Sequence, residues 1–353
     1  MAKKNLLYQQ IKEYLIGMIN ANEDSANYRL PSENQLAKKF GCSRIAVQRA
    51  FSSLKAEGYI YSQQGRGTFV QPYRPGAFGY KPAIVSMLVP TLDSQYIQSI
   101  VNSTNMTVSR NGMNLVVFTT GDNGLIEDEF IKSSLHIGAK GIIIIPSSFR
   151  QLSKEMMQLA LTSFPTILID RFIPGLSLSV VSCDHFMSAY NATKLLISRG
   201  HKVIGFVSQP VNYCSALSER LKGFECAMHE ARIHTADNHF MFDIYNPAFE
   251  KYFSDYIRHV QPTAIICSAK YYGIQIARLF SRMSIKPGYD VELIIYDKEY
   301  EDESVLLKDE AFSINQHPDE IGSLASMKLI HLIDGSLKGT TQTLVREDIT
   351  QFN

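Results

Sequence analysis

Hydrophobic residues follow a helical spacing in the first part of the chain. Over residues 6–20, apolar side chains recur every three or four positions and so fall on one face of a helix. Similar stripes predict shorter helices over residues 33–40 and 44–57. Two β-like apolar runs, residues 59–61 and 68–70, then flank a glycine-containing turn. The pattern predicts a small α+β unit of three helices and a hairpin.

Residues with strong terminal preferences mark the ends of the second and third helices. Ser32 is a good N-cap, because its hydroxyl can accept from a free N–H of the first turn, and Glu33 suits the positive end of the helix. Gly41 is expected to end this helix, since glycine adopts a left-handed conformation without a Cβ clash. Ser43 then caps the next one. Two helices joined by so short a turn form a helix-turn-helix, and the hairpin makes it winged.

Beyond a proline- and glycine-rich linker at residues 72–82, short apolar runs alternate with helical patterns. The expected strands occupy residues 84–89, 115–119, 141–145, 166–170, 180–181, 203–207, 264–267 and 293–296. The expected helices occupy residues 97–111, 126–137, 152–163, 184–199, 215–229, 247–259 and 271–281. This alternation is typical of parallel strands covered on both faces, and it is too long for one open sheet. We therefore expect a multidomain chain, with an N-terminal domain at residues 1–71 and a two-lobed α/β body at residues 83–353.

Charge divides at the same place as the hydrophobic pattern. The whole chain of 353 residues has a formal net charge of +1, but residues 1–82 hold 12 Lys and Arg against 5 Asp and Glu. The first part is thus about +7 and the remainder about −6. A basic head on an acidic body is typical of a protein whose head binds nucleic acid, because cationic side chains neutralise phosphates.

Composition argues against several other classes of protein. No run approaches 18 consecutive apolar residues, and the first residues lack the apolar core of a secretory signal. We expect no membrane segment and a cytoplasmic location. The five cysteines are scattered and odd in number, and neither cysteines nor histidines show metal-ligand spacing. No disulfide, no metal and no cofactor is therefore expected.

One forty-residue segment carries a specific resemblance. LPSENQLAKKFGCSRIAVQRAFSSLKAEGYIYSQQGRGTFV, residues 30–70, resembles the DNA-binding domain of the gluconate-repressor (GntR) family of bacterial transcription regulators. The resemblance implies a winged domain that binds double-stranded operator DNA as a dimer, with the second helix of the motif in the major groove and the wing on the minor groove or backbone. The residues expected at the DNA are Arg29, Ser32, Ser43, Arg44, Gln48, Arg49, Gln64, Gly65, Arg66 and Gly67.

The chain departs from that family at Ala46-Val47-Gln48, where Thr-Val-Arg is usual. An arginine suits the O6 and N7 atoms of guanine, whereas a glutamine suits N6 and N7 of adenine. We expect Gln48 to move the operator preference away from guanine. The alternative is that Gln48 touches only phosphate or water. A footprint in which recognition of a guanine depends on Gln48 would contradict the first interpretation.

The body is similar to the effector domain of the lactose/galactose-repressor family, which has the periplasmic sugar-binding-protein fold. The matching pieces are GIIIIP at 141–146, PTILID at 165–170, DHFMSAYNATKLLISRGHKVIGF at 184–206, RLKGFE at 220–225, PTAIICS at 262–268, IIYD at 294–297 and INQHPDEIGSLA at 314–325. A gluconate-type head on this body resembles the arabinose-repressor subgroup. The resemblance implies two lobes joined by three crossovers, with a small molecule between them. Lobe one is expected to hold residues 83–182 and 312–335, and lobe two residues 183–311 and 336–353.

Candidate effector residues lie just after strands, because open α/β sheets bind ligands beyond the carboxyl ends of their strands. By the resemblance, Arg220 would bind neighbouring sugar hydroxyls with its fork of donors, and Asp297 would accept from two hydroxyls. The alternatives are an arginine paired with an acid and an aspartate in a turn. Weaker candidates are Ser94, Tyr96, Ser147, Asp170 and Arg171. Asp184 is expected to be a helix cap instead.

A second departure follows Cys267. Where the family commonly has Asn-Asp, this chain has Ala269-Lys270 after Ser268. Two carbonyl-bearing groups are lost and a cation is gained. The change favours either a deoxy sugar or an acidic or phosphorylated sugar that uses Lys270, so Ser268 and Lys270 join the candidates. Unchanged affinity in Lys270→Ala would contradict the cationic alternative.

Together these features favour a ligand-controlled transcription factor, a repressor of carbohydrate-utilisation genes that binds a palindromic operator as a homodimer. A monosaccharide or derivative would close the cleft and alter the spacing of the two heads, with a coupling free energy of about 1–3 kcal/mol. Two alternatives are a DNA-binding protein whose body only dimerises and an enzyme acting on a sugar. No G-x-G-x-x-G after a strand, no G-x-x-x-x-G-K-[ST] loop and no G-x-S-x-G turn supports an enzyme.

Overall fold

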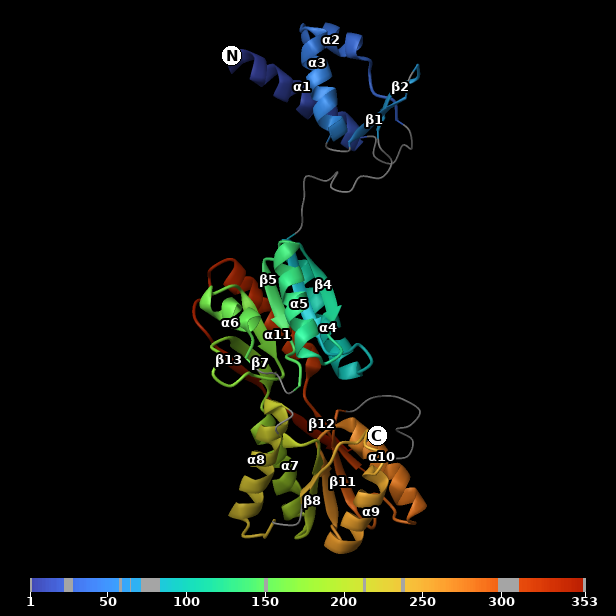
Figure 1. Ribbon diagram of the computed structural model, residues 1–353, viewed down its shortest axis with the longest axis vertical. Coiled ribbons are helices and arrows are strands. Elements are labelled where there is room, and N and C mark those ends of the chain that lie inside the picture. The colour runs from blue at the N-terminus through green and yellow to red at the C-terminus, as the bar shows by residue number, and fades with distance from the viewer. Residues whose placement is uncertain are drawn as a thin grey trace. The chain divides into compact units, whose positions relative to one another are not determined.

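The chain divides into two compact units, Met1–Pro82 and Ala83–Asn353 (Figure 1). The computed structural model describes residues 2–21, 28–56, 59–63, 65–70, 83–148, 152–211, 214–235, 239–297 and 311–351. In this part of the chain, no helix is both long enough and apolar enough to cross a membrane. The two units are described separately below.

The first unit is the winged helix-turn-helix that the sequence predicts. Its elements are α1 (Ala2–Ala21), α2 (Glu33–Phe40), α3 (Arg44–Ala56), β1 (Ile60–Gln63) and β2 (Gly67–Val70). The strands pair antiparallel, with Ile60 opposite Val70. Ile11 and Leu15 of α1 pack against Val47 and Leu54 of α3 in one buried core, which confirms the expected apolar faces.

The signals at the two ends of α2 act as expected. The Ser32 hydroxyl accepts from Gln35 N, and the Gln35 side chain accepts from Ser32 N at 2.8 Å, so the two residues form a capping box. Gly41 has φ +58° and ends α2 in the left-handed conformation. Short-range hydrogen bonds therefore fix both ends of α2, the first helix of the helix-turn-helix.

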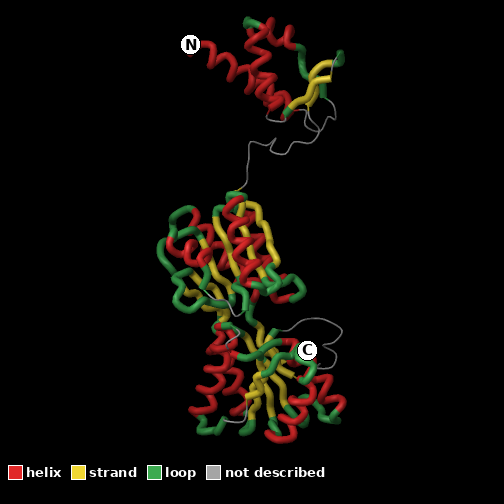
Figure 2. Tube along the Cα trace, in the orientation of Figure 1, coloured by secondary structure: helices red, strands yellow, loops and turns green. Residues whose placement is uncertain are grey.

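Lobe one of the second unit is a parallel sheet between two layers of helices (Figures 1 and 2). Its strands, in spatial order, are β13 (Gln342–Val345), β7 (Ser179–Cys183), β6 (Thr166–Ile169), β5 (Gly141–Ile144), β3 (Ala83–Val89) and β4 (Met113–Thr119). The helices α4 (Gln95–Arg110) and α11 (Pro318–Ile333) cover one face, while α5 (Gly124–His136) and α6 (Lys154–Leu161) cover the other. Continuous apolar strands such as β5 and β6 are fully buried for this reason.

Lobe two has the same layered plan. Its sheet runs β14 (Asp348–Gln351), β12 (Ala311–Asn315), β11 (Glu292–Tyr296), β10 (Ala264–Cys267), β8 (Ile204–Ser208) and β9 (His239–Met241). The helices α7 (His185–Ser198) and α8 (Ser215–Glu230) pack on one face, and α9 (Phe249–Val260) and α10 (Lys270–Arg282) on the other. The expected two-lobed α/β body is thus confirmed.

The expected division of the C-terminal residues between the lobes is wrong in two places. The chain passes between the lobes after β7, after β12 and after β13, so the three crossovers are present. However, β12 belongs to lobe two, since it pairs with β11, and β13 belongs to lobe one, since it pairs with β7. Only α11 and the residues that form β14 fall in the lobe to which they were assigned. These strands are placed by long-range pairing, and the sequence pattern did not indicate β12, or the antiparallel edge strand β14 beside it.

Candidate functional site

A cavity of about 560 Å3 lies between the two lobes of the second unit. Asp170 follows β6 of lobe one directly, and Ser268 and Asp297 follow β10 and β11 of lobe two. All three residues line the cavity, which therefore sits at the carboxyl ends of both sheets, as expected for open α/β sheets.

Arg220 of α8 is the best-connected side chain in this cavity. It is only 5% exposed. Its Nη1 donates to the carbonyl oxygen of Ser268, and its Nη2 donates to Gln316 Oε1 at 2.8 Å and to His185 Nδ1 at 3.2 Å. The guanidinium lies 3.7 Å from the ring centroid of Tyr296. Four directions of contact fix its plane.

His185 links this arginine to lobe one. Because a guanidinium only donates, Nδ1 of His185 accepts, and the ring proton of neutral His185 sits on Nε2. Nε2 lies 2.9 Å from the carbonyl oxygen of Asp170 and 3.4 Å from its Oδ1. The Tyr96 hydroxyl also donates to Asp170 Oδ1, at 3.1 Å. A chain of hydrogen bonds therefore joins the lobes across the back of the cavity.

The side chains around Asp170 in this hydrogen-bond network keep its carboxylate ionised. Burial alone would raise the pKa of Asp170, but the hydrogen bond from His185 and the positive charges of Arg171 and Arg220 lower that pKa well below its ordinary value. Burial, followed by the nearby charge of Asp170, raises the pKa of Tyr96 well above its ordinary value. The cavity thus presents a carboxylate acceptor and a protonated phenol at neutral pH.

Gln316, which follows β12, completes the buried end of the cavity around Arg220, here called the inner end. Its amide nitrogen donates to Asp297 Oδ1 while its oxygen accepts from Arg220, so its orientation is fixed by the chemistry of its neighbours. Asp170 and Asp297 both have left-handed backbones, with φ of +67° and +66°. Aspartate tolerates this conformation better than most residues, and it turns the chain sharply at the end of each strand.

Two buried polar atoms of the inner end have no partner among the described residues. They are Nε of Arg220 and the hydroxyl of Ser268. Buried polar groups are nearly always hydrogen-bonded, so unpaired groups in the lining of a cavity indicate that a ligand or water completes them. Both atoms can donate, which suits hydroxyl oxygens.

The structure brings most of the predicted effector residues together. Those that line the cavity are Ser94, Tyr96, Asp170, Arg171, Arg220, Ser268, Lys270 and Asp297. Asp184 caps α7 as expected, since its carboxylate accepts from Met187 N. Ser147 is a correction: it is 2% exposed and does not line the cavity. Its N and its hydroxyl both donate to Glu127 Oε2 at 2.7 Å, so it is bound on the side of α5 instead.

His185 and Gln316 were not predicted from the sequence. Both come just after a strand that leads into a crossover, and this position was the available signal. Three tyrosines of lobe two that line the cavity were also not predicted: Tyr245, Tyr271 and Tyr272. Arg171 lines the cavity, and its Nη1 donates to Asp122, to the Pro146 carbonyl and to Ser148.

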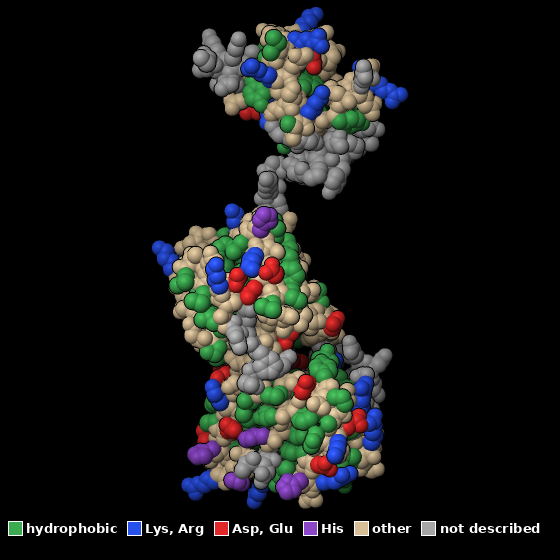
Figure 3. Space-filling view, in the orientation of Figure 1, with side chains coloured by type: hydrophobic (Ala, Val, Ile, Leu, Met, Phe, Trp, Pro, Cys, Tyr) green, Lys and Arg blue, Asp and Glu red, His purple; other side chains and the backbone are tan. Residues whose placement is uncertain are grey.

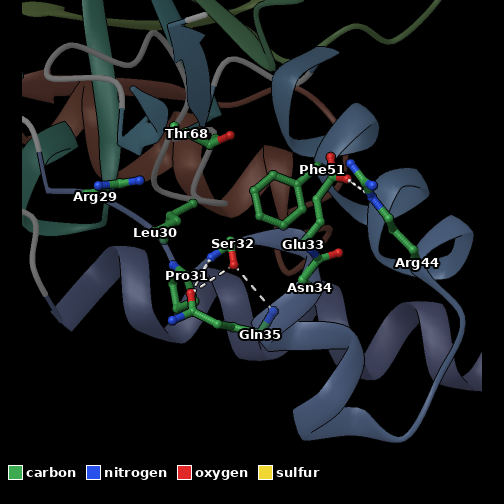
Figure 4. Close-up of a pocket in the computed structure, with 11 residues that line it drawn as sticks. Arg29, Leu30, Pro31, Ser32, Glu33, Asn34, Gln35, Arg44, Phe51 and Thr68 are labelled. Atoms are coloured by element: carbon green, nitrogen blue, oxygen red, sulfur yellow. Dashed lines mark hydrogen bonds and ion pairs between the residues drawn. The ribbon is translucent and has the colours of Figure 1, made fainter. Parts of the chain in front are cut away.

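The first unit holds a second candidate site, on α2, α3 and the wing. Arg44 Nε and Gln48 Nε2 of α3 both donate to Glu33 Oε2, at 2.8 and 3.0 Å, and Figure 4 shows the Arg44 side chain directed at Glu33. The hydrogen bond from Arg44 lowers the pKa of Glu33. One carboxylate therefore orients two of the predicted DNA-contacting side chains.

The other predicted DNA-contacting residues surround this group. Ser43, Arg44, Gln48 and Arg49 are exposed at or near the start of α3, and Gly65 and Arg66 are exposed at the tip of the wing. Arg29 lies beside the wing, because a Cβ on Gly67 would approach Arg29 Nε to 2.7 Å. The Ser32 hydroxyl is engaged in the capping box, and Gln64 lies outside the described residues. On the face of this unit that Figure 3 shows, Lys and Arg side chains outnumber Asp and Glu.

Comparison with known proteins matches the two units to two family models. Residues 7–70 match the bacterial regulatory proteins of the gntR family, and residues 83–349 match the periplasmic binding proteins and sugar binding domain of the LacI family. The arabinose metabolism transcriptional repressor of Halalkalibacterium halodurans is 24% identical over 350 residues, which cover 95% of this chain and 90% of that protein.

Solved structures share the fold of the body. The transcription regulator CcpA of Lactococcus lactis has a TM-score of 0.68 at 20% identity, over 77% of this chain and 98% of its own. A LacI family transcriptional regulator from Enterococcus faecium with bound ribose has a TM-score of 0.64 at 17% identity, over 76% of this chain and 97% of its own.

Proposed function

The chain belongs to the family of periplasmic binding proteins and LacI-type sugar binding domains, with a regulatory head of the gntR family, and on this premise we propose that it is a repressor of carbohydrate-utilisation genes whose operator binding is controlled by a neutral sugar. The relative from Halalkalibacterium halodurans is named as a repressor of arabinose metabolism, and the structure from Enterococcus faecium holds ribose. The observation that carries the proposal is the inner end of the cleft, where Arg220, Asp170 and Asp297 converge.

The lining favours a neutral ligand over a sugar acid or sugar phosphate. The described lining holds three cationic side chains, Arg171, Arg220 and Lys270, against four carboxylates, Asp93, Asp122, Asp170 and Asp297. An anionic effector would meet net repulsion, whereas hydroxyls can donate to the carboxylates and accept from Arg220 and Ser268. Lys270 is already counted among the three cations, so its presence does not make the cavity favour an anion.

Arg220 couples such a ligand to the hinge. Two of the three crossover segments supply its partners, because His185 follows β7 and Gln316 follows β12. A sugar that draws Arg220 into new hydrogen bonds alters the contacts that hold these segments. In a homodimer on a palindromic operator, closure of each cleft changes the spacing of the two heads, and the protein acts in the cytoplasm, where that DNA lies.

A melting series of the full chain tests this proposal. A neutral sugar at a hundred times its Kd is expected to stabilise the protein by about 2.7 kcal/mol, and Lys270→Ala is expected to keep its affinity within about threefold. Sugar acids and phosphates are expected to bind more weakly than their neutral parents. Tight binding of a sugar phosphate that is lost in Lys270→Ala would contradict the proposal that the effector is neutral.

For the head, we propose that Glu33 sets operator specificity by orienting Arg44 and Gln48. A carboxylate only accepts, so the amide nitrogen of Gln48 faces Glu33. The remaining amide N–H and the oxygen of Gln48 are then free to meet N7 and N6 of adenine. The predicted preference of Gln48 for adenine stays a prediction.

Glu33→Gln is expected to lower the ratio of operator to random-DNA affinity about tenfold. The two exposed contacts contribute about 0.2–1 kcal/mol each to orientation, and removing a negative charge strengthens binding to any phosphate backbone. The measurement compares an operator selected from random duplexes with a scrambled duplex at one salt concentration. Glu13→Gln, which makes the same charge change at an exposed position of α1, is the control. An equal fall of the ratio in both variants would contradict a specific role for Glu33.

A further inference from the structure

The cleft has a buried polar end and an exposed aromatic end. At the inner end, Arg220, Ser268 and Gln316 are almost completely buried. At the outer end, Tyr245 is 75% exposed and Tyr271 is 52% exposed, although both line the same cavity. Exposed aromatic rings beside a binding cavity offer large, rigid contact surfaces at low entropic cost.

The two outer tyrosines are held by one connection within lobe two. The Tyr272 hydroxyl, next to Tyr271 on α10, donates to the carbonyl oxygen of Phe242 at 2.7 Å. Phe242 lies in the loop that carries Tyr245, whose backbone N donates to Asp243 Oδ1 at 3.0 Å. The loop after β9 and the start of α10 are thus tied together, which fixes the backbones of both tyrosines.

Lobe one supplies polar groups to the same cavity. Thr91 and Asp93 line it from the loop after β3. The Thr91 hydroxyl donates to Asp93 Oδ2 at 2.9 Å, and Asp93 N donates to the Thr91 oxygen at 3.1 Å. Asp93 is exposed, and its carboxylate keeps further capacity to accept from a hydroxyl.

The size of the cavity exceeds that of one sugar ring. A hexose of twelve heavy atoms occupies well under about 360 Å3, because bonded atoms pack more closely than separate water molecules with a share of about 30 Å3 each. The cavity measures about 560 Å3. A single ring at the inner end therefore leaves room for a second one.

We infer that the effector is a neutral disaccharide. One ring lies at the inner end against Arg220, Asp170 and Asp297. The second ring lies at the outer end, with its C–H face on Tyr245 or Tyr271 and its hydroxyls toward Asp93. The inference rests on the proposed function, since it assigns the ligand class of the same cleft.

The test is titration calorimetry of the full chain with matched pairs of sugars. The pairs are glucose with maltose and cellobiose, galactose with lactose and melibiose, xylose with xylobiose, and arabinose with arabinobiose. One disaccharide is expected to bind at least about tenfold more tightly than either of its component rings, because the outer ring adds an aromatic contact.

Three variants separate the two ends of the cleft. Tyr245→Ala and Tyr271→Ala are each expected to weaken the disaccharide several-fold and the double variant about tenfold, while the single-ring sugar changes less than about twofold. Tyr289→Ala is the control, because Tyr289 is an 87% exposed tyrosine of lobe two that does not line the cavity. It is expected to change neither affinity.

Each outcome decides between the two levels of the proposal. If a monosaccharide binds as tightly as every disaccharide that contains it, the effector is a single ring; the proposed function then stands and the disaccharide inference fails. The inference also fails if the double variant leaves disaccharide affinity unchanged. If no sugar of either size binds, both the inference and the proposed sugar control fail.

Discussion

Arg220→Lys is expected to weaken effector binding about a hundredfold and to lower the free energy of unfolding by about 2–4 kcal/mol. The guanidinium bonds Ser268, Gln316 and His185 in separate directions while it lies flat on Tyr296. An ammonium group keeps the charge but is too compact to reach all three acceptors. Because the site is buried, each acceptor left without a donor costs about 1–3 kcal/mol.

The measurement pairs urea unfolding with calorimetry of the effector. Lys222→Arg is the matched control, because Lys222 lies on the same helix, is largely exposed and pairs with Glu219 on the surface. This reverse exchange is expected to change stability by less than about 0.5 kcal/mol. Arg220→Lys with unchanged effector affinity would show that the ligand does not use this side chain.

The head could be predicted from the sequence because its signals are local. Ser32 and Gln35 form a capping box three residues apart, and Gly41 ends the same helix. No partner distant in sequence is needed to place either helix end. The hydrogen bonds from Arg44 and Gln48 to Glu33 were not predicted, because they depend on how α2 and α3 pack against each other.

Residues of the cavity lining could be predicted where they lie in a piece of the family pattern or just after a strand. Asp297 and Arg220 both line the cavity, and each lies in a piece of the family pattern, Asp297 at the end of a strand and Arg220 within α8. Ser147 also follows a strand, β5, yet it does not line the cavity. The buried carboxylate of Glu127 takes both its donors, and Glu127 lies twenty residues earlier, on α5. Which way a side chain turns at a strand end depends on such neighbours, and periodicity does not record them.

Lobe assignment failed for a similar reason. β13 pairs with β7, more than 150 residues earlier in the chain, and β12 and β14 pair with each other across an excursion through lobe one. Short edge strands have weak patterns, because one side of each faces solvent. The lobe that each of these strands joins depends on which sheet has an unpaired edge within its reach.

Gly223→Ala is expected to destabilise the second unit by about 1–3 kcal/mol or more and to weaken effector binding at least about tenfold. A Cβ at Gly223 would lie 2.1 Å from the carbonyl oxygen of Phe186, and this backbone contact forces α8 away from α7. Phe186 adjoins His185, and Arg220 lies one turn before Gly223, so the same displacement separates His185 from Arg220 across their 3.2 Å contact.

Gly17→Ala is the control, because Gly17 lies in α1 with open space around its Cβ position, and alanine there is expected to stabilise the helix by about 0.5–1 kcal/mol. Urea unfolding and effector calorimetry of both variants test this, and an unchanged urea midpoint for Gly223→Ala would mean that the two helices can part without cost. Because the substitution touches no cavity-lining atom, a loss of affinity here would show that the spacing of α7 and α8 itself holds the inner end of the cleft in its binding geometry.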